Sequence, residues 1–189
     1  MRLLKNQIMM VVIACTYAAS AMSQEAADGP ERRLRIESHA FADGGVIPDK
    51  YTLANDAPVS PPLSWKNAPA ETLSFALIMH DPDAVTQSAS ADIVHWIVFN
   101  IPGGGSGALP EDLPHEARLA DGTIQAVSRR GYPGYTGPGA RFVYHHYTFE
   151  LFALDTVLAL DADTSRDELM AAMDGHVIAK AAYVGLFHR

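Results

Sequence analysis

Three stretches of the chain are strongly hydrophobic, and we expect each of them to be a strand buried on both faces. They cover residues 74–80, 93–99 and 144–154. Apolar runs of this length that are rich in β-branched and aromatic residues are typical of strands in the middle of a sheet. The segments between them contain many proline, glycine and serine residues and are expected to be loops, notably residues 102–107 and 131–139.

Weaker patterns predict short extended segments near the start of the chain. Leu34 and Ile36 alternate with charged neighbours, which indicates a strand with one buried face. A turn at residues 43–45 precedes an apolar extended piece at residues 46–48. The proline-rich residues 58–62 exclude a helix there, because proline lacks the amide hydrogen and restricts the residue before it.

The helical period appears only near the C-terminus. Ser165 and Glu168 form a capping-box pattern, apolar residues such as Leu169 follow, and Gly175 ends the segment. Residues 176–184 fit either a second short helix or a strand. Without an internal repeat or a linker, the pattern predicts one mainly β domain with a small helical C-terminal part.

The first residues have the features of a secretion signal. Two positive residues, Arg2 and Lys5, precede an apolar run at residues 8–19, which is too short to span a membrane. Small residues then offer cleavage near Ala21 or Ser23.

We therefore expect a signal peptide at residues 1–23, a flexible lead-in at residues 24–33, and the domain at residues 34–189. A periplasmic or secreted location follows, with lipidation at Cys15 as the alternative. Loss of the signal peptide would remove the chain's only cysteine and change its formal net charge from −8 to −10. Such an acidic, globular composition argues against a nucleic-acid partner and against a polybasic membrane anchor.

Polar side chains occur near one end of each strong strand. Asp81 continues the alternating face that ends in Met79, and His95 has the same parity as Ile97 and Phe99. If the strands pair suitably, four groups converge at one edge of the core: Asp81, His95, His145 and Tyr147.

Such a cluster would suit a small anion. Imidazole and phenol groups supply donors, a carboxylate can orient a histidine, and the backbone amides of residues 134–139 can add more donors. The alternatives are four ordinary polar residues at strand ends, or a metal site built from two histidines and an aspartate. The glycine run at residues 103–107 is not a dinucleotide motif, since prolines prevent the helix that must follow it.

Several motifs in order along the chain resemble the phosphatidylethanolamine-binding proteins, in particular the bacterial branch called Raf-kinase-inhibitor-like. Each motif is modest alone, but their ordered occurrence is specific. They lie at residues 41–48, 60–65, 81–84, 95–96, 134–138, 145–147 and 185–189.

The resemblance implies a β-sandwich with a large central sheet, a smaller sheet and short peripheral and C-terminal helices. It also implies a cavity that binds an anion such as phosphate or a phospholipid head group. We expect no catalytic residue, metal or cofactor. By matching motif, the ligand-binding residues would be Asp81, Asp83, His95, Gly137, Pro138, His145 and Tyr147.

The chain departs from the family pattern at several positions. Val85 replaces a usual proline, and His146 replaces a usual arginine. By strand parity, the His146 side chain should point away from the pocket. The loop at residues 139–144 carries bulky residues beside the expected cavity. Leu53 and Gly139 stand where the bacterial branch often has cysteines.

These observations favour an exported protein that holds a small anion without turning it over. A hydrolase of phosphate esters or phospholipids is an alternative, as is an inhibitor of a protease or kinase. Homodimer formation rests on analogy alone.

Overall fold

The computed structural model describes residues 33–84 and 92–189, and the structural statements below concern these residues. The predicted signal peptide, nearly all of the predicted lead-in, and Val85 lie outside them. Residues 34–189 form one unit of the chain. Within the described ranges, no helix is both long and apolar enough to cross a membrane.

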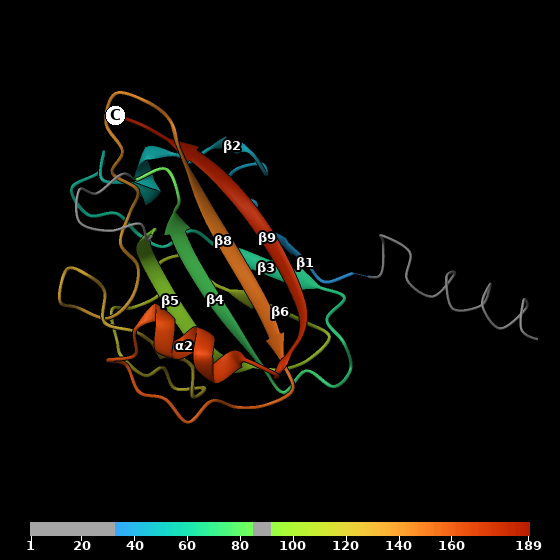
Figure 1. Ribbon diagram of the computed structural model, residues 1–189. Helices are drawn as coiled ribbons and strands as arrows, with labels where there is room; N and C mark the ends of the chain where they lie inside the picture. The colour runs from blue at the N-terminus through green and yellow to red at the C-terminus, as the bar shows by residue number, and fades with distance from the viewer. Residues whose placement is uncertain (1–32, 85–91) are drawn as a thin grey trace, which may run out of the picture. The chain divides into compact units, whose positions relative to one another are not determined.

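A six-stranded sheet is the centre of the fold (Figure 1), with strand order β2-β9-β8-β4-β5-β7. Neighbouring strands are antiparallel, except that β2 runs parallel to β9. The strands are β2 (Gly45–Val46), β4 (Ser74–Asp81), β5 (Ile93–Pro102), β7 (Ile124–Gln125), β8 (His145–Leu154) and β9 (Val177–Phe187).

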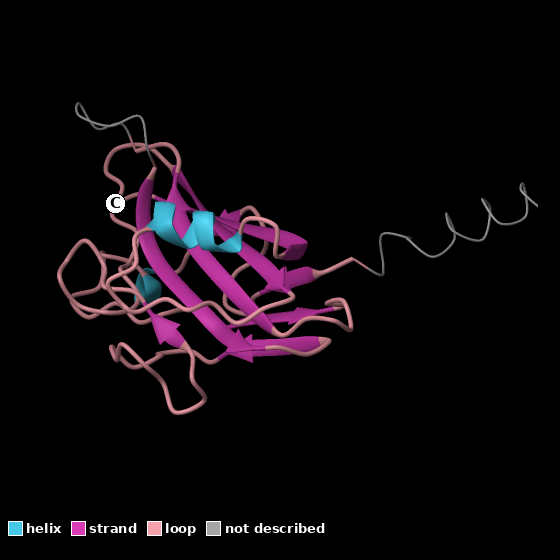
Figure 2. Cartoon of the chain, turned by 60° about the horizontal axis from the view of Figure 1, so that its bottom comes forward, coloured by secondary structure: helices cyan, strands magenta, loops and turns pink. Residues whose placement is uncertain are grey.

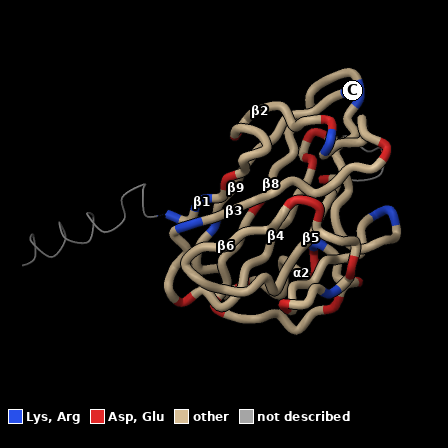
Figure 3. Tube along the Cα trace, turned by 180° about the vertical axis from the view of Figure 1, so that it is seen from behind, with Lys and Arg blue, Asp and Glu red and all other residues tan. Residues whose placement is uncertain are grey.

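The three predicted buried strands are β4, β5 and β8, which lie next to one another. Every residue of β4 is buried. It contains no Lys, Arg or Glu, and its one Asp, Asp81, lies at its end; in Figure 3 both β4 and β5 are tan along almost their whole length. The scarcity of charged side chains along β4 agrees with apolar layers on both faces of the sheet.

One of these layers separates the large sheet from a three-stranded sheet of order β1-β3-β6. Trp65 of the small sheet packs edge-on against Phe75 of β4, with ring centroids 5.2 Å apart. Ile36, which the alternation predicted to be buried, lies in the same layer. The strands are β1 (Arg35–Glu37), β3 (Leu63–Lys66) and β6 (Ser106–Leu109).

Strand β6 occupies part of the glycine-rich segment that was expected to be a loop. At Gly107 a Cβ atom would lie 2.7 Å from the Trp65 ring. Glycine therefore allows β6 to pair with β3 directly beneath the indole, a packing requirement that hydrophobic periodicity does not reveal.

The other apolar layer lies between the large sheet and α2 (Arg166–Met173), which crosses its face (Figure 2). The predicted capping box is present between Ser165 and Glu168, and Leu169 and Met173 are buried. The residues after α2 form β9 rather than a second helix. The described chain also contains a short 3₁₀ helix, η2 (Asp49–Tyr51).

A β-bulge in β5 corrects the predicted face of His95. Met79 pairs with Trp96 and His80 pairs with Val94, so His95 is the extra residue between them. Ile97 and Phe99 lie in the layer under α2, whereas Trp96 belongs to the layer between the sheets. Simple alternation would have placed His95 with Ile97 and Phe99, which is wrong because the bulge shifts the alternation by one residue.

Candidate functional site

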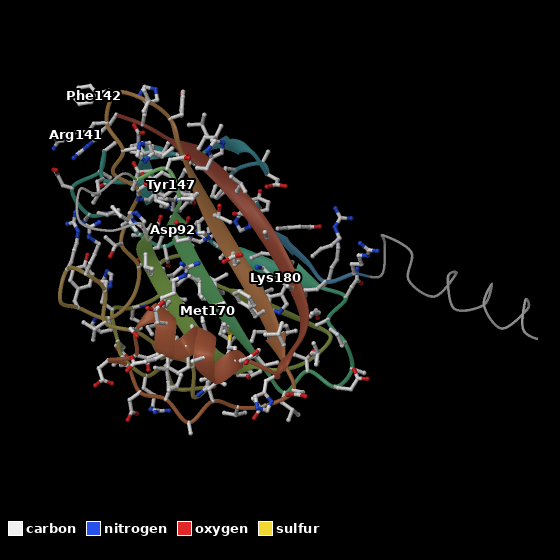
Figure 4. The ribbon with its side chains drawn as sticks, viewed as in Figure 1. Asp92, Arg141, Phe142, Tyr147, Met170 and Lys180 are labelled. Carbon is white, nitrogen blue, oxygen red and sulfur yellow. The ribbon has the colours of Figure 1, made fainter. Side chains whose placement is uncertain are left out.

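A pocket of about 370 Å³ lies where β4 ends and β5 and β8 begin, next to the loop of residues 134–140. Tyr147 lies beneath the neighbouring loop that carries Arg141 and Phe142 (Figure 4). Five of the seven residues predicted to bind a ligand line this pocket: Asp81, His95, Gly137, His145 and Tyr147.

The other two predicted residues are outside the lining formed by the described chain. Pro138 is buried, and its carbonyl accepts a hydrogen bond from the Leu53 amide at 2.8 Å. Asp83 is exposed and accepts two 2.7 Å hydrogen bonds from His146, one from the backbone N–H and one from ring Nδ1. These bonds, the backbone one most strongly, lower the pKa of Asp83.

Asp81 organises the interior of the pocket. Its side chain is only 4 % exposed, and Oδ2 accepts a 2.8 Å hydrogen bond from Nδ1 of His145. The Asp83 amide donates to the other oxygen at 3.0 Å. Because a carboxylate only accepts, Nδ1 of His145 carries the proton, and Nε2 is the ring nitrogen left for a ligand.

Tyr147 connects the pocket floor to the adjoining loop. Its hydroxyl accepts hydrogen bonds from the amides of Gly139 and Ala140 at 3.2 and 3.0 Å. Burial, together with the charge and hydrogen bond of Asp81, raises the pKa of Tyr147 to about 12. The phenol therefore keeps its proton at neutral pH.

The bulged His95 lies against Tyr147, with ring centroids 5.2 Å apart. Its Nδ1 donates to the Thr136 carbonyl at 2.9 Å, and the Thr136 amide donates back to the His95 carbonyl at 3.0 Å. Burial lowers the pKa of His95, although the Thr136 hydrogen bond and the Asp81 charge oppose this effect. At neutral pH this ring is uncharged and Nε2 is an acceptor.

The residues of the lining that sequence reasoning did not assign include Leu53, Arg129, Arg130 and Thr136. The two arginines come from an exposed loop between β7 and β8, outside the predicted strands, so periodicity could not place them. The sequence signal that could have identified them is two adjacent arginines in an otherwise acidic chain, which indicate a place where an anion can bind. Thr136 lies within a family motif, and its hydroxyl is buried without a hydrogen-bond partner among the described residues.

A second cavity, of about 380 Å³, lies against the first turn of α2 and shares Ile93, His95 and Arg129 with the first. Its described lining contains no counterpart of the Asp81–His145 pair, so the first pocket is the candidate site. Among the described residues, no group of three or more His, Cys, Asp or Glu side chains is placed to hold a metal ion.

Comparison with known proteins identifies the family. The model of the family described as Phosphatidylethanolamine-binding protein matches residues 37–188. The chain belongs to the phosphatidylethanolamine-binding protein family.

Relatives and solved structures of this family cover most of the chain. A UPF0098 protein of Methanothermobacter thermautotrophicus is 42 % identical over 82 % of this chain and 99 % of its own length. A putative phosphatidylethanolamine-binding protein homologue from Chlamydia trachomatis has a TM-score of 0.74 and 33 % identity, covering 84 % of this chain and 99 % of its own. Escherichia coli YbcL, a member of the mammalian PEBP family, has a TM-score of 0.71 and 28 % identity, with coverage of 83 % and 99 %. The predicted fold, with a large and a smaller sheet, is confirmed.

Two departures from the phosphatidylethanolamine-binding protein pattern have simple structural outcomes. His146, at the usual arginine position, is exposed and pairs with Asp83 instead of lining the pocket. Phe142 is 90 % exposed and absent from the pocket lining, so the bulky loop leaves the cavity open.

Leu53 and Gly139, at the family's frequent cysteine positions, face each other. A Cβ atom on Gly139 would lie 3.8 Å from the Leu53 Cβ and 2.8 Å from its Cδ1. In this member of the family, the leucine side chain covers the bare glycine backbone and forms part of the pocket wall.

Proposed function

We propose that this protein binds a small phosphate-bearing anion in the Asp81–His145 pocket and holds it without turnover. The observation that carries the proposal is a set of hydrogen-bond donors around one cavity. It includes the Thr136 hydroxyl, which has no partner in the described part of the chain, the His145 ring and two guanidinium groups, those of Arg129 and Arg130. Arginine is well suited to phosphate because its planar fork donates two parallel hydrogen bonds.

The buried carboxylate does not contradict an anionic ligand. Both oxygens of Asp81 are already engaged, one by His145 and one by the Asp83 amide. Asp81 therefore acts as an acceptor that orients His145, while the groups left for a ligand are mainly donors. Gly137, which has no side chain, adds a place where a ligand can approach the backbone.

The pocket volume limits the ligand to a small molecule or a head group. A cavity of about 370 Å³ is near the lower end of ligand sites in proteins. Inorganic phosphate fits this chemistry, and so does the phosphate ester of a small alcohol. The name of the family points to the head group of phosphatidylethanolamine, which belongs to the second class.

Calorimetry with inorganic phosphate and with phosphoethanolamine tests the proposal. We expect His145→Ala to bind at least about tenfold more weakly than the wild type, since a hydrogen bond to a charged group contributes about 1.5–3 kcal/mol. His176→Ala is the matched control, because His176 also donates from Nδ1 to a carboxylate, that of Asp155 at 2.9 Å, outside the pocket. Equal binding by the two variants would remove the site assignment.

The pH dependence supplies a second test. We expect the affinity for phosphate to weaken as the pH rises through the lowered pKa of His95, because deprotonation turns Nε2 of His95 from an N–H donor into an acceptor. A flat affinity profile below pH 6.5 would contradict a role for His95 as a donor.

A hydrolase is the second candidate, favoured by the Asp81–His145 pair. This pairing leaves Nε2 of His145 as a general base for a water molecule. The described lining contains no serine or cysteine nucleophile, so attack would come from water. If the wild type hydrolyses p-nitrophenyl phosphate and His145→Ala does not, the protein is a hydrolase and does not merely bind its ligand.

A further inference from the structure

The loop between the pocket residues Ala140 and His145 exposes an unusual amount of apolar surface. Phe142 is 90 % exposed, Val143 62 % and Tyr144 50 %. Three neighbouring large apolar residues at one surface site are costly in water and commonly mark a contact surface. We call residues 141–144 the apolar loop.

The backbone holds Phe142 in this outward position. Its φ of 75° lies in the left-handed region, which is uncommon for a bulky residue. The other described non-glycine residues with positive φ are Asn67, Asn100 and Asp112, and such short polar residues tolerate this region well. Strain of this kind persists only where surrounding contacts enforce it.

The contacts that brace the apolar loop come from His188 and Arg189. The Arg189 amide donates to the Ala140 carbonyl at 3.1 Å, and the Phe142 amide donates to Arg189 O at 3.4 Å. The Tyr144 ring packs edge-on against His188, with centroids 4.1 Å apart. The loop is therefore presented as a fixed protrusion and does not fold back over the pocket.

The position of the apolar loop links it to the candidate site. It joins Ala140 to His145, and both of these residues line the pocket. Figure 4 shows Arg141 and Phe142 together at the end of the sheet that holds Tyr147, away from Met170 and Lys180. A surface that covers the loop would lie beside the pocket.

We propose that the apolar loop inserts into the interfacial region of a phospholipid bilayer. Aromatic and aliphatic side chains flanked by arginine are suited to this region, because the rings enter the acyl boundary while guanidinium groups reach the phosphates. Here Phe142 and Val143 form the tip, with the exposed Arg141 and Arg189 beside it. A convex tip needs no complementary hollow in a bilayer, whereas a protein partner would have to provide one.

The net charge of the chain indicates which lipid head groups the membrane should carry. A formal net charge of −8 disfavours a strongly anionic surface, so we assign a zwitterionic one. Apolar insertion depends little on ionic strength, and binding should persist at high salt. Membrane docking by the apolar loop does not depend on the proposed function. If the pocket binds phosphate as proposed, docking also brings phosphate head groups close to it.

Flotation with vesicles of phosphatidylcholine and phosphatidylethanolamine tests the proposal. We expect the wild type to float with the vesicles. Phe142→Asn, which suits a left-handed backbone, should reduce partitioning at least about tenfold, the ratio that corresponds to burial of one large apolar side chain. Phe142→Trp should show a blue-shifted fluorescence component when vesicles are added.

Val143→Ser and Val157→Ser form a matched pair, because both valines are 62 % exposed. Val157 follows the opposite end of β8, so only Val143→Ser should weaken flotation. Equal loss in both variants, or a wild type that stays with the soluble fraction, would overturn the proposal. If sedimentation without lipid shows a wild-type dimer that Phe142→Asn dissociates, and no flotation occurs, the loop is a self-association surface and lipid docking is wrong.

The pocket and the loop can fail separately. His145→Ala should still float with vesicles, and Val143→Ser should still bind soluble phosphoethanolamine in the calorimeter. Loss of flotation in His145→Ala would mean that the pocket alone holds the membrane, which contradicts docking by the apolar loop.

Discussion

At the scale of single residues, Asp81 has the largest influence on the site. Its buried carboxylate accepts from the His145 ring and from the Asp83 amide, and it interacts with the Tyr147 hydroxyl. A buried charge is tolerated only where such partners compensate for the lost water. The same contacts orient His145 and fix Tyr147, so one side chain determines how two others are presented.

The Tyr147 hydroxyl should have a measurable effect on stability. Tyr147→Phe leaves the amides of Gly139 and Ala140 without their acceptor in a buried place. We expect the free energy of unfolding in urea to fall by about 1–3 kcal/mol, the cost of a buried donor without a partner. Tyr144→Phe, at a half-exposed tyrosine, should change it by less than about 0.5 kcal/mol. Similar values for both variants would contradict this account.

Burial of His95 predicts a contribution to acid sensitivity. Its pKa in the folded state is below the ordinary 6.5, so the unfolded chain binds more protons as the pH falls through about 6.5. The free energy of unfolding should therefore decrease with falling pH between 6.5 and the lowered pKa of the folded protein.

His95→Asn keeps a donor for the Thr136 carbonyl but removes the titrating ring. Urea unfolding over a pH series should show a shallower loss of stability for this variant. Parallel curves for the two proteins would show that other groups cause the acid sensitivity.

At the scale of elements, the site depends on a bulge and a loop. The bulge in β5 brings His95 to the pocket face, and the His95–Thr136 hydrogen bonds tie the loop of residues 134–140 to that strand. Tyr147 of β8 holds the other end of this loop through two amides. The pocket wall is thus fixed by strands that are themselves buried, which suits a preformed binding site.

The facing positions Leu53 and Gly139 predict a disulfide that can be introduced. Their Cβ separation of 3.8 Å equals the usual value for a disulfide, and Gly139 does not have a positive φ. In the double variant Leu53→Cys/Gly139→Cys we expect a disulfide to form. The oxidised variant should have a higher Tm than the same variant after reduction, and its free energy of unfolding should be higher by up to about 4 kcal/mol. Thiol titration of the folded protein checks the bond. Two free thiols under oxidising conditions would contradict the geometry.

At the scale of the whole molecule, the large sheet separates two apolar layers and carries the site at one end. The small sheet closes one layer, and α2 with its neighbouring loop closes the other. Because β4 is buried on both faces, its one carboxylate, that of Asp81, lies where the strand leaves the core. The ends of β4, β5 and β8 thereby concentrate polar chemistry beside a rigid core.

We propose that the whole chain is exported and that its first residues are removed. Expression of the full sequence in a Gram-negative bacterium should give a periplasmic protein whose first residue is Met22 or Gln24 by mass spectrometry. Replacing Ile13 with Asp in the apolar run should keep the protein in the cytoplasm with its N-terminus intact. An uncleaved chain in the wild-type periplasm, or a lipid-modified Cys15, would contradict the proposal.

The buried strands β4, β5 and β8 and the helix α2 were predictable because their signals are local. A continuous apolar run identifies a strand buried on both faces, and Ser165 with Glu168 identifies the start of α2. Strand β6 was missed because its glycines serve the packing of Trp65, a contact between distant segments. His95 was assigned to the correct cluster for an incorrect reason, since only the pairing of β5 with β4 reveals the bulge.

The amino-acid sequence by itself determined the family, the main strands and the identity of the central polar groups. These depend on side-chain type and on spacing within one segment. Tertiary structure alone decided that Asp83 turns outward to His146, that Arg129 and Thr136 join the pocket, and that Phe142 points into solvent. Each of these outcomes depends on how separate segments meet, and neither periodicity nor composition carries that information.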